Sequence, residues 1–167
     1  MKLDTKRLTL LSSLVAVAMI LSYIESLLPA FVAVPGVKVG LSNIATVFAL
    51  YILGAPSAVC VSVVRVCLSA LLFGNFASFL YSLGGALLAL VCMILIKRVK
   101  VFSTVGVSTV GAVMHNAGQV AVACVVMENA AISLYIVPLV ISGTVAGAVI
   151  GVVSGILCEK LSKRLKL

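Results

Sequence analysis

Long apolar runs separated by charged residues, proline or glycine restrict the fold of this chain more than any other feature. Six such runs occur, at about 8–28, 41–53, 56–73, 76–96, 103–127 and 132–158. A helix needs about 20 predominantly apolar residues to cross roughly 30 Å of hydrocarbon. The runs therefore predict an all-α, polytopic membrane protein, with six transmembrane helices forming a single domain over residues 1–167.

Composition supports this class and leaves little room for anything else. The chain is 63% hydrophobic and 10% charged, whereas soluble domains are about 25% charged. No polar stretch is long enough for a soluble domain beside the spans. The run at 41–53 is short for a membrane crossing. We expect it to begin nearer Val37, or to be surrounded by protein rather than by lipid.

The basic residues indicate the topology. Ten of the twelve Lys and Arg residues form three clusters: Lys2, Lys6 and Arg7; Lys97, Arg98 and Lys100; Lys160, Lys163, Arg164 and Lys166. Basic residues gather on the cytoplasmic side of membrane proteins. Six crossings place all three clusters and both termini in the cytoplasm. The basic balance is thus explained by topology and contact with the lipid bilayer, and it does not indicate binding to nucleic acid.

One connecting loop, at 29–40, is unusually apolar and contains Pro29, Pro35, Gly36 and Gly40. It joins the first two spans on the predicted outer side. Such a segment can fold back as a lid or re-entrant loop, provided that protein or a cavity covers its backbone. An ordinary interfacial connector is the alternative, and the sequence leaves both open.

Ionisable and polar side chains lie within several spans, where they are costly. Arg65 lies in the third run, and an arginine at bilayer depth costs roughly 2.5–3.5 kcal/mol even on lenient scales. His115 lies in the fifth run. We predict a polar, net-positive chamber that binds a small anionic or amphiphilic molecule, because a guanidinium suits carboxylate or phosphate. The candidate substrate-binding residues are Asn43, Arg65, Tyr81, His115, Asn116 and Gln119.

Purely structural roles are the alternative for the same side chains. Arg65 could pair with Glu25, with Glu128 or with helix carbonyls and so lock the bundle. The polar residues of the fifth run could serve as interhelical hydrogen bonds, which are worth about 0.6 kcal/mol each on average.

Small residues at four-residue spacing mark two helix faces. The last run contains Gly143, Gly147, Gly151 and Gly155, and the first contains Ser12 and Ala16. Stripes of this kind let another helix approach closely. They predict either packing within the chain or docking of a partner subunit.

The residues that the chain lacks exclude several kinds of chemistry. Its acidic residues are Asp4, Glu25, Glu128 and Glu159, and it has one histidine and five scattered cysteines without a C-x-x-C pair. An aspartate-rich Mg²⁺ motif, a two-metal site or a zinc site cannot be built from this set. No G-x-x-x-x-G-K-[ST] loop is present. We therefore expect no catalytic residue, metal or cofactor, and energy supplied by a partner or an ion gradient.

Several short motifs together resemble those of the Gx transporter family, whose members are often labelled heptaprenyl diphosphate synthase component I. They are PGVKVGLSN at 35–43, Arg65-x-x-x-Ser69 with Phe73-Gly74, YSLGGA at 81–86, and Gly106-Val107-Ser108 before His115-Asn116-x-x-Gln119. The resemblance covers about residues 8–158. Their order and spacing make the resemblance more specific than any one motif.

This family is similar to the substrate-binding S components of energy-coupling factor (ECF) transporters. The resemblance implies a six-helix subunit of the bacterial cell membrane that captures a vitamin-like or isoprenoid- or quinone-related nutrient. A T component and ATPase subunits would supply the energy. S components carry A-x-x-x-A in the first helix, and Ser12-x-x-x-Ala16 stands here instead. The alternatives are a non-catalytic membrane component of a heptaprenyl diphosphate synthase and a membrane assembly scaffold.

Overall fold

The computed structural model describes residues 5–27, 40–99 and 101–165, apart from the side chains of residues 162, 164 and 165. The predicted loop at 29–40, apart from Gly40, lies outside the described residues, as does Asp4. The helices are α1 (Thr5–Leu27), α2 (Asn43–Ile52), α3 (Ala55–Phe73), α4 (Phe76–Arg98), α5 (Thr104–Val126) and α6 (Ile136–Leu165), with a 3₁₀ helix, η1 (Ala130–Tyr135), before α6. The predicted all-α fold with six helices is confirmed.

The last helix differs from the run that predicted it. The first residues of the predicted span at 132–158 form η1, and α6 then continues to Leu165, beyond the predicted end at Cys158. The polar residues after Cys158 favour helix as strongly as the apolar ones before it, so the helix extends past the apolar run.

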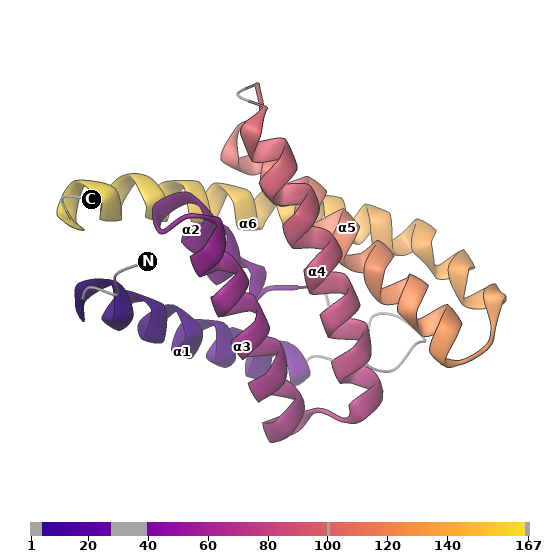
Figure 1. Ribbon diagram of the computed structural model, residues 1–167. Helices are drawn as coiled ribbons and strands as arrows, with labels where there is room; N and C mark the ends of the chain where they lie inside the picture. Colours follow the sequence, from indigo (N-terminus) through magenta and orange to yellow (C-terminus); the bar gives the residue numbers. More distant parts are fainter. Residues whose placement is uncertain (1–4, 28–39, 100, 166–167) are drawn as a thin grey trace.

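Helix α5 is central to the bundle and packs against both α4 and α6. Figure 1 shows α6 running along the back of the molecule, while α3 and α4 lie side by side and are joined by the turn at Gly74–Asn75. The start of α1 and the end of α6 lie at the same side of the bundle. Helix α2 contacts α1, α3 and α6.

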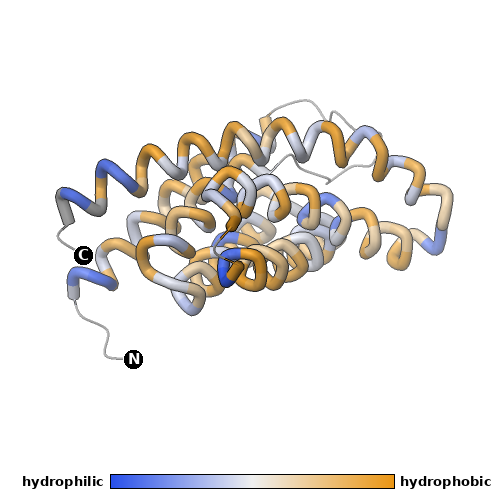
Figure 2. The backbone as a smooth tube through the Cα atoms, turned by 90° about the horizontal axis from the view of Figure 1, so that it is seen from above, coloured by the Kyte–Doolittle hydropathy of each residue, from blue (hydrophilic) through white to orange (hydrophobic). Residues whose placement is uncertain are grey.

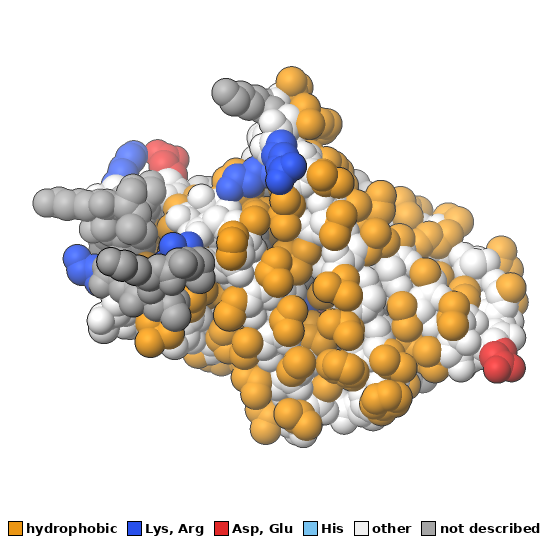
Figure 3. All heavy atoms as spheres, viewed as in Figure 1, with side chains coloured by type: hydrophobic (Ala, Val, Ile, Leu, Met, Phe, Trp, Pro, Cys, Tyr) orange, Lys and Arg blue, Asp and Glu red, His pale blue; other side chains and the backbone are white. Residues whose placement is uncertain are grey.

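Five helical segments are long and apolar enough to cross a membrane: Thr5–Leu27, Ala55–Phe73, Phe76–Arg98, Thr104–Val126 and Ala130–Leu161. Large apolar side chains such as Leu71, Phe76 and Val125 are exposed on their surfaces. Figure 3 shows these side chains spread over most of the visible face. Such a surface suits lipid rather than water, so the chain is a multi-pass membrane protein.

Helix α2 differs from the other five because its ten residues span only about 15 Å at 1.5 Å per residue. Seven of the ten are buried, including Asn43 and Thr46. Protein therefore surrounds this helix. This agrees with the expectation that the short run is enclosed by protein rather than by lipid. A short helix that is surrounded by protein need not match the thickness of the membrane.

Two basic side chains donate hydrogen bonds to backbone carbonyls at the C-terminal end of α2. The Lys97 Nζ donates to the Leu50 carbonyl at 2.6 Å, and it lies 4.8 Å from the centre of the Tyr51 ring. The Arg7 Nη2 donates to the Leu53 carbonyl at 2.6 Å. The last carbonyls of a helix have no partner within the helix and carry partial negative charge. Two cations from other helices therefore stabilise the buried end of α2.

Replacement of Lys97 by methionine is expected to lower the stability of the protein by about 1 kcal/mol, because a cation at a helix C-terminus contributes that much. Thermal unfolding followed by circular dichroism would measure the change. The matched control is Arg98→Met, since Arg98 is the exposed neighbour on the same helix. Equal melting temperatures for the two variants would contradict the capping role.

The described basic residues, apart from Arg65, gather at one end of the bundle, called here the basic end: Lys6, Arg7, Lys97, Arg98, Lys160 and Lys163. Figure 3 shows blue side chains towards the left and top, and an acidic group at the opposite tip. Glu128 is exposed on the turn after α5, at this opposite end, called here the Glu128 end.

Candidate functional site

Polar side chains lie inside the bundle as well as at its ends. Figure 2 shows hydrophilic segments in the middle of the tube, between apolar stretches. The buried polar set includes Ser22, Glu25, Ser42, Asn43, Thr46, Ser62, Arg65, Ser69, His115, Asn116 and Gln119. Buried polar groups at membrane depth are costly unless they are paired or serve a ligand. Their positions therefore define the candidate site.

Arg65, near the middle of α3, is the central member of this set, and only 4% of its surface is exposed. Its Nη1 donates to the Ser42 hydroxyl at 2.6 Å, which joins α3 to the start of α2. Its Nε and Nη2 atoms are buried and have no hydrogen-bond partner among the described residues. Each such donor costs about 1–3 kcal/mol, so the guanidinium retains two binding positions that the described protein does not fill.

A carboxylate lies close to this guanidinium. Glu25, near the end of α1, is buried and accepts a hydrogen bond from the Gly40 N–H. It is near enough to act electrostatically on Arg65. Among the described residues, the ion pair within 4 Å joins Lys163 and Glu159. Arg65 and Glu25 do not approach each other to that distance.

The carboxylate of Glu25 therefore lies in the neighbourhood of the Arg65 guanidinium. The physical reason is the crossing of α1 and α3, which contact each other and bring the end of α1 towards the centre of α3. Glu128, the other carboxylate considered as a partner of Arg65, is exposed at the far end of the bundle.

Gly40 brings two of the predicted residues together. Its φ is +93°, a conformation that suits glycine. A Cβ at this position would lie 2.8 Å from the Asn43 Nδ2 and 3.9 Å from the His115 Cδ2. Asn43 on α2 and His115 on α5 therefore meet over the Gly40 backbone, next to the carboxylate of Glu25.

A pair of glycines on α4 positions the polar face of α5. A Cβ on Gly85 would lie 2.7 Å from the His115 carbonyl oxygen and 2.8 Å from the Gln119 Cγ. A Cβ on Gly118 would lie 2.7 Å from the Gly84 carbonyl oxygen. The backbones of α4 and α5 thus touch at this level, as small residues allow in membrane bundles. His115 and Gln119 are consequently buried against the backbone of α4.

The predicted site residues separate into two groups. Arg65, Asn43, His115 and Gln119 lie along one continuous path, which runs through Ser42 and Gly40. Asn116 lies on another face of α5, and its Nδ2 donates to the Leu139 carbonyl of α6 at 2.8 Å. That contact is the interhelical hydrogen bond considered as the alternative role.

Tyr81 also lies away from the Arg65 path. It is buried in an apolar cluster that it forms with Val120, Ala123, Ile132 and Leu139. The hydroxyl-bearing residues that α4 offers to Arg65 are instead Ser78 and Ser82. They are one helical turn apart and share a face, and the sequence already offers them, beside Tyr81, as polar residues of the fourth run.

A small crevice between α3 and α4 borders Arg65. It is lined by Arg65, Val66, Ser69, Ala70, Ser78, Phe79 and Ser82, and its volume of about 10 Å³ is close to the space that one water needs. Three serine residues therefore line the same small space as the arginine. On the other side of α3, the Ser69 Oγ approaches the Met19 Sδ of α1 at 3.6 Å.

The donor set does not suit a metal ion in the described part of the chain. No group of three or more His, Cys, Asp or Glu side chains there is arranged to hold one. The polar groups of the site are an arginine, a carboxylate, amides, hydroxyls and an imidazole. This arrangement can recognise oxygen atoms and amide groups of an organic molecule.

The glycine stripe of α6 packs within the chain. A Cβ on Gly147 would lie 2.6 Å from the Thr109 Cα, and a Cβ on Gly151 would lie 2.6 Å from the Val105 Cα. Gly143 faces the Asn116 amide in the same way, and only Gly155 has ordinary space around it. By contrast, Ser12 and Ala16 on α1 are exposed.

Comparisons with known proteins place the chain in a family. The fold is similar to the solved structure of the S component of a bacterial ECF transporter, with a TM-score of 0.59 and 20% sequence identity over 97% of this chain and 98% of that chain. No curated protein matches the sequence. Residues 14–157 match the family model described as heptaprenyl diphosphate synthase component I. Because this match covers most of the sequence, the chain belongs to the heptaprenyl diphosphate synthase component I family.

Proposed function

We propose that this protein is a membrane-embedded substrate-binding subunit, similar in role to the S component that shares its fold. It captures a small anionic or amphiphilic nutrient, vitamin-like or isoprenoid- or quinone-related, and itself catalyses no reaction. The observation that carries the proposal is the buried Arg65, whose Nε and Nη2 donors have no partner among the described residues and which lines a crevice with three serines.

Two features of Arg65 favour a binding role over a structural one. A structural arginine at this depth gains most when its donors are all satisfied by protein, and only the bond from Nη1 to Ser42 is of this kind. The guanidinium also presents its donors as a planar fork, which matches the two oxygens of a carboxylate or phosphate. A ligand with acceptor oxygens would satisfy the remaining donors and displace water from the crevice.

The charge distribution suggests which way the protein faces. We place the basic end and both termini in the cytoplasm of a bacterial cell membrane, because basic residues favour that side. The Glu128 end then faces outside. Gly40, which packs beside Asn43 and His115, directly follows in the sequence the loop that we expect on the outer side. Access for a nutrient from outside follows from this arrangement.

Native mass spectrometry of protein extracted gently from its own membrane would test the binding role and identify the cargo. The wild type is expected to carry a discrete additional mass that is lost in Arg65→Ala. The matched control is Arg98→Ala, because Arg98 is exposed at the basic end. If folded Arg65→Ala retained the same mass, Arg65 would be a structural residue and the proposal would fail.

The sequence contains no P-loop, and a partner or an ion gradient would supply the energy for uptake. We propose a T component with ATPase subunits, which would dock on the exposed Ser12–Ala16 face of α1. Ala16→Trp is expected to abolish co-purification of the T component while leaving cargo binding intact. Val17→Trp is the control, since Val17 is exposed on a neighbouring face of the same helix. If the T component co-purified equally with both variants, it would dock on a surface other than the Ser12–Ala16 face.

The family description favours a second candidate, a non-catalytic membrane component of a heptaprenyl diphosphate synthase. In that case a soluble partner would contribute the catalytic carboxylates. Co-expression of the candidate partner with and without this chain would decide the matter. Unchanged rate and chain length of the product would exclude this role. A scaffold that uses the α6 glycines is disfavoured, because α5 already covers Gly143, Gly147 and Gly151.

A further inference from the structure

An apolar groove lies next to the Arg65 crevice, on the surface of the helix pair α3 and α4. It is lined by Cys67, Ala70, Leu71, Asn75, Phe76 and Phe79, and its volume is about 390 Å³. That volume falls within the range of roughly 300–1,000 Å³ that is usual for small-molecule sites. Apart from Asn75, the groove is lined only by apolar side chains.

The groove and the crevice have two residues in common. Ala70 and Phe79 line both, so they form the partition between the apolar space and the arginine. Along α3, Leu71 at the rim is six residues from Arg65, a distance of about 9 Å at 1.5 Å per residue. The crevice that contains Arg65 and the apolar surface groove are therefore neighbours, with Ala70 and Phe79 between them.

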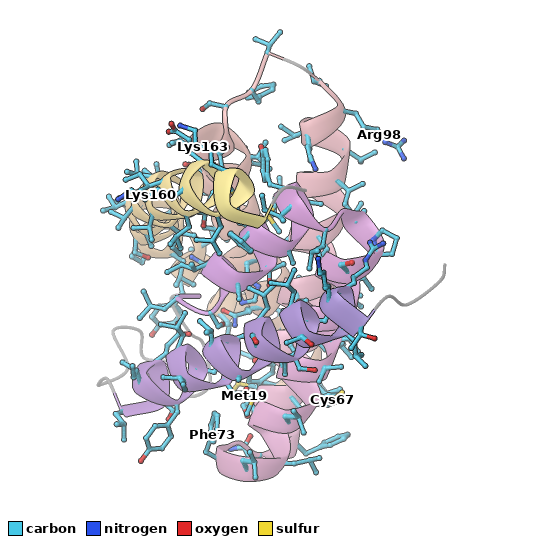
Figure 4. All side chains as sticks on the ribbon, turned by 90° about the vertical axis from the view of Figure 1, so that its left-hand side faces the viewer. Met19, Cys67, Phe73, Arg98, Lys160 and Lys163 are labelled. Carbon is cyan, nitrogen blue, oxygen red and sulfur yellow. The ribbon has the colours of Figure 1, made fainter. Side chains whose placement is uncertain are left out.

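The groove opens where lipid would lie. Leu71 is 81% exposed and Phe76 is 76% exposed, and both line the groove. Figure 4 shows Cys67 and Met19 on opposite sides of α3, so the groove side of this helix faces away from α1. A molecule in the groove could therefore reach the crevice laterally from the membrane.

From this continuity we infer that the cargo is an amphiphile that enters sideways between α3 and α4. Its oxygen-bearing anionic head binds Arg65, and its single hydrocarbon tail occupies the apolar groove. The inference rests on the proposed binding function and specifies its substrate class. The positive charge of Arg65 is complementary to an anionic head group, and its Nε and Nη2 donors have no acceptor among the described residues. These two properties favour an anionic amphiphile over a neutral hydrocarbon.

The chain contains no tryptophan, so a single introduced tryptophan reports on its own surroundings. Leu71→Trp places this reporter at the rim of the groove. Leu72→Trp is the matched control, because Leu72 is 70% exposed at the same depth and does not line the groove. The probe is dodecyl phosphate with bromine at the end of its chain, at low mole fraction in phosphatidylcholine nanodiscs. Bromine quenches tryptophan fluorescence only at short range.

Quenching is expected to be several-fold stronger in Leu71→Trp than in Leu72→Trp, and Arg65→Gln in the Leu71→Trp background is expected to remove the difference. Equal quenching of the two reporters would overturn the inference. Stronger quenching of Leu71→Trp that persists in Arg65→Gln would also overturn the inference. The same holds if brominated phosphatidylcholine gives the same preference, because the groove would then hold a bulk lipid chain.

The proposed function has its own readout in the same samples. The two reporters could be quenched equally while native mass spectrometry still shows an additional mass that depends on Arg65. If that molecule stays in the aqueous phase on extraction, the binding role holds for a small polar cargo. Loss of that Arg65-dependent mass as well would contradict both proposals.

Discussion

Gly147→Ala is expected to destabilise the protein substantially, although alanine is the better helix former. The new Cβ would lie 2.6 Å from the Thr109 Cα, 2.9 Å from the Ala112 Cβ and 3.0 Å from the Ser108 carbonyl oxygen. Two of these three atoms belong to the backbone of α5 and cannot move without displacing the helix. Overpacking of this kind typically costs about 1–3 kcal/mol. Thermal unfolding in detergent would show the loss as a lower melting temperature.

Gly155→Ala is the matched control because it lies two turns further along the same stripe. The nearest atom to its new Cβ would be the Thr104 Cβ at 3.9 Å, which is ordinary contact. Helix propensity alone then favours alanine, by up to about 1 kcal/mol. The two variants are therefore expected to change stability in opposite directions. If both were as stable as wild type, the close packing of α5 and α6 would be wrong.

Arg65→Ala is expected to weaken binding of the cargo by at least about 100-fold. Hydrogen bonds to a charged group are worth about 1.5–3 kcal/mol each, and the side chain has two donors to offer, Nε and Nη2. Every 1.4 kcal/mol corresponds to a tenfold change in affinity. A titration of the co-purified molecule into nanodisc-embedded protein would measure the dissociation constant.

The variant Arg65→Lys separates charge from geometry. Lysine keeps the positive charge but loses the planar fork, so affinity is expected to lie between those of the wild type and Arg65→Ala. Arg98→Lys is the control for a change of the same kind at the basic end. A wild-type dissociation constant for Arg65→Ala would show that the cargo does not contact the guanidinium.

Sequence alone identified the elements of the site that stand out against an apolar background. Arg65 and His115 are conspicuous because neither run contains another Asp, Glu, Lys, Arg or His residue. Glu25 was considered only as a possible partner of Arg65, because it lies near the end of its span, where charged residues are common. Only the crossing of α1 and α3 shows that it lies beside Arg65.

Helical periodicity shows which residues share a face, but it does not give the rotation of one helix against another. His115 and Gln119 are one turn apart and both pack against α4, as their spacing indicates. Asn116 is rotated by about 100° from His115, and that rotation directs it to α6. On α4 the same limit applies to Tyr81, which is one residue from Ser82 but belongs to the apolar cluster.

The glycine stripe of α6 illustrates a second limit. A repeat of small residues predicts that another helix approaches closely, but the repeat is the same for a helix of this chain and for a helix of a partner. In the structure α5 takes this position at Gly147 and Gly151. Exposure of Ser12 and Ala16 leaves the weaker stripe on α1 as the candidate for a partner.

An experimental density map of the protein with its co-purified cargo would test the central claim most directly. We predict density for an oxygen-bearing head within hydrogen-bonding distance of the Arg65 Nε and Nη2 atoms, bordered by Ser69, Ser78 and Ser82. Well-ordered cargo at a different place, with both Arg65 donors satisfied by protein groups, would contradict the account.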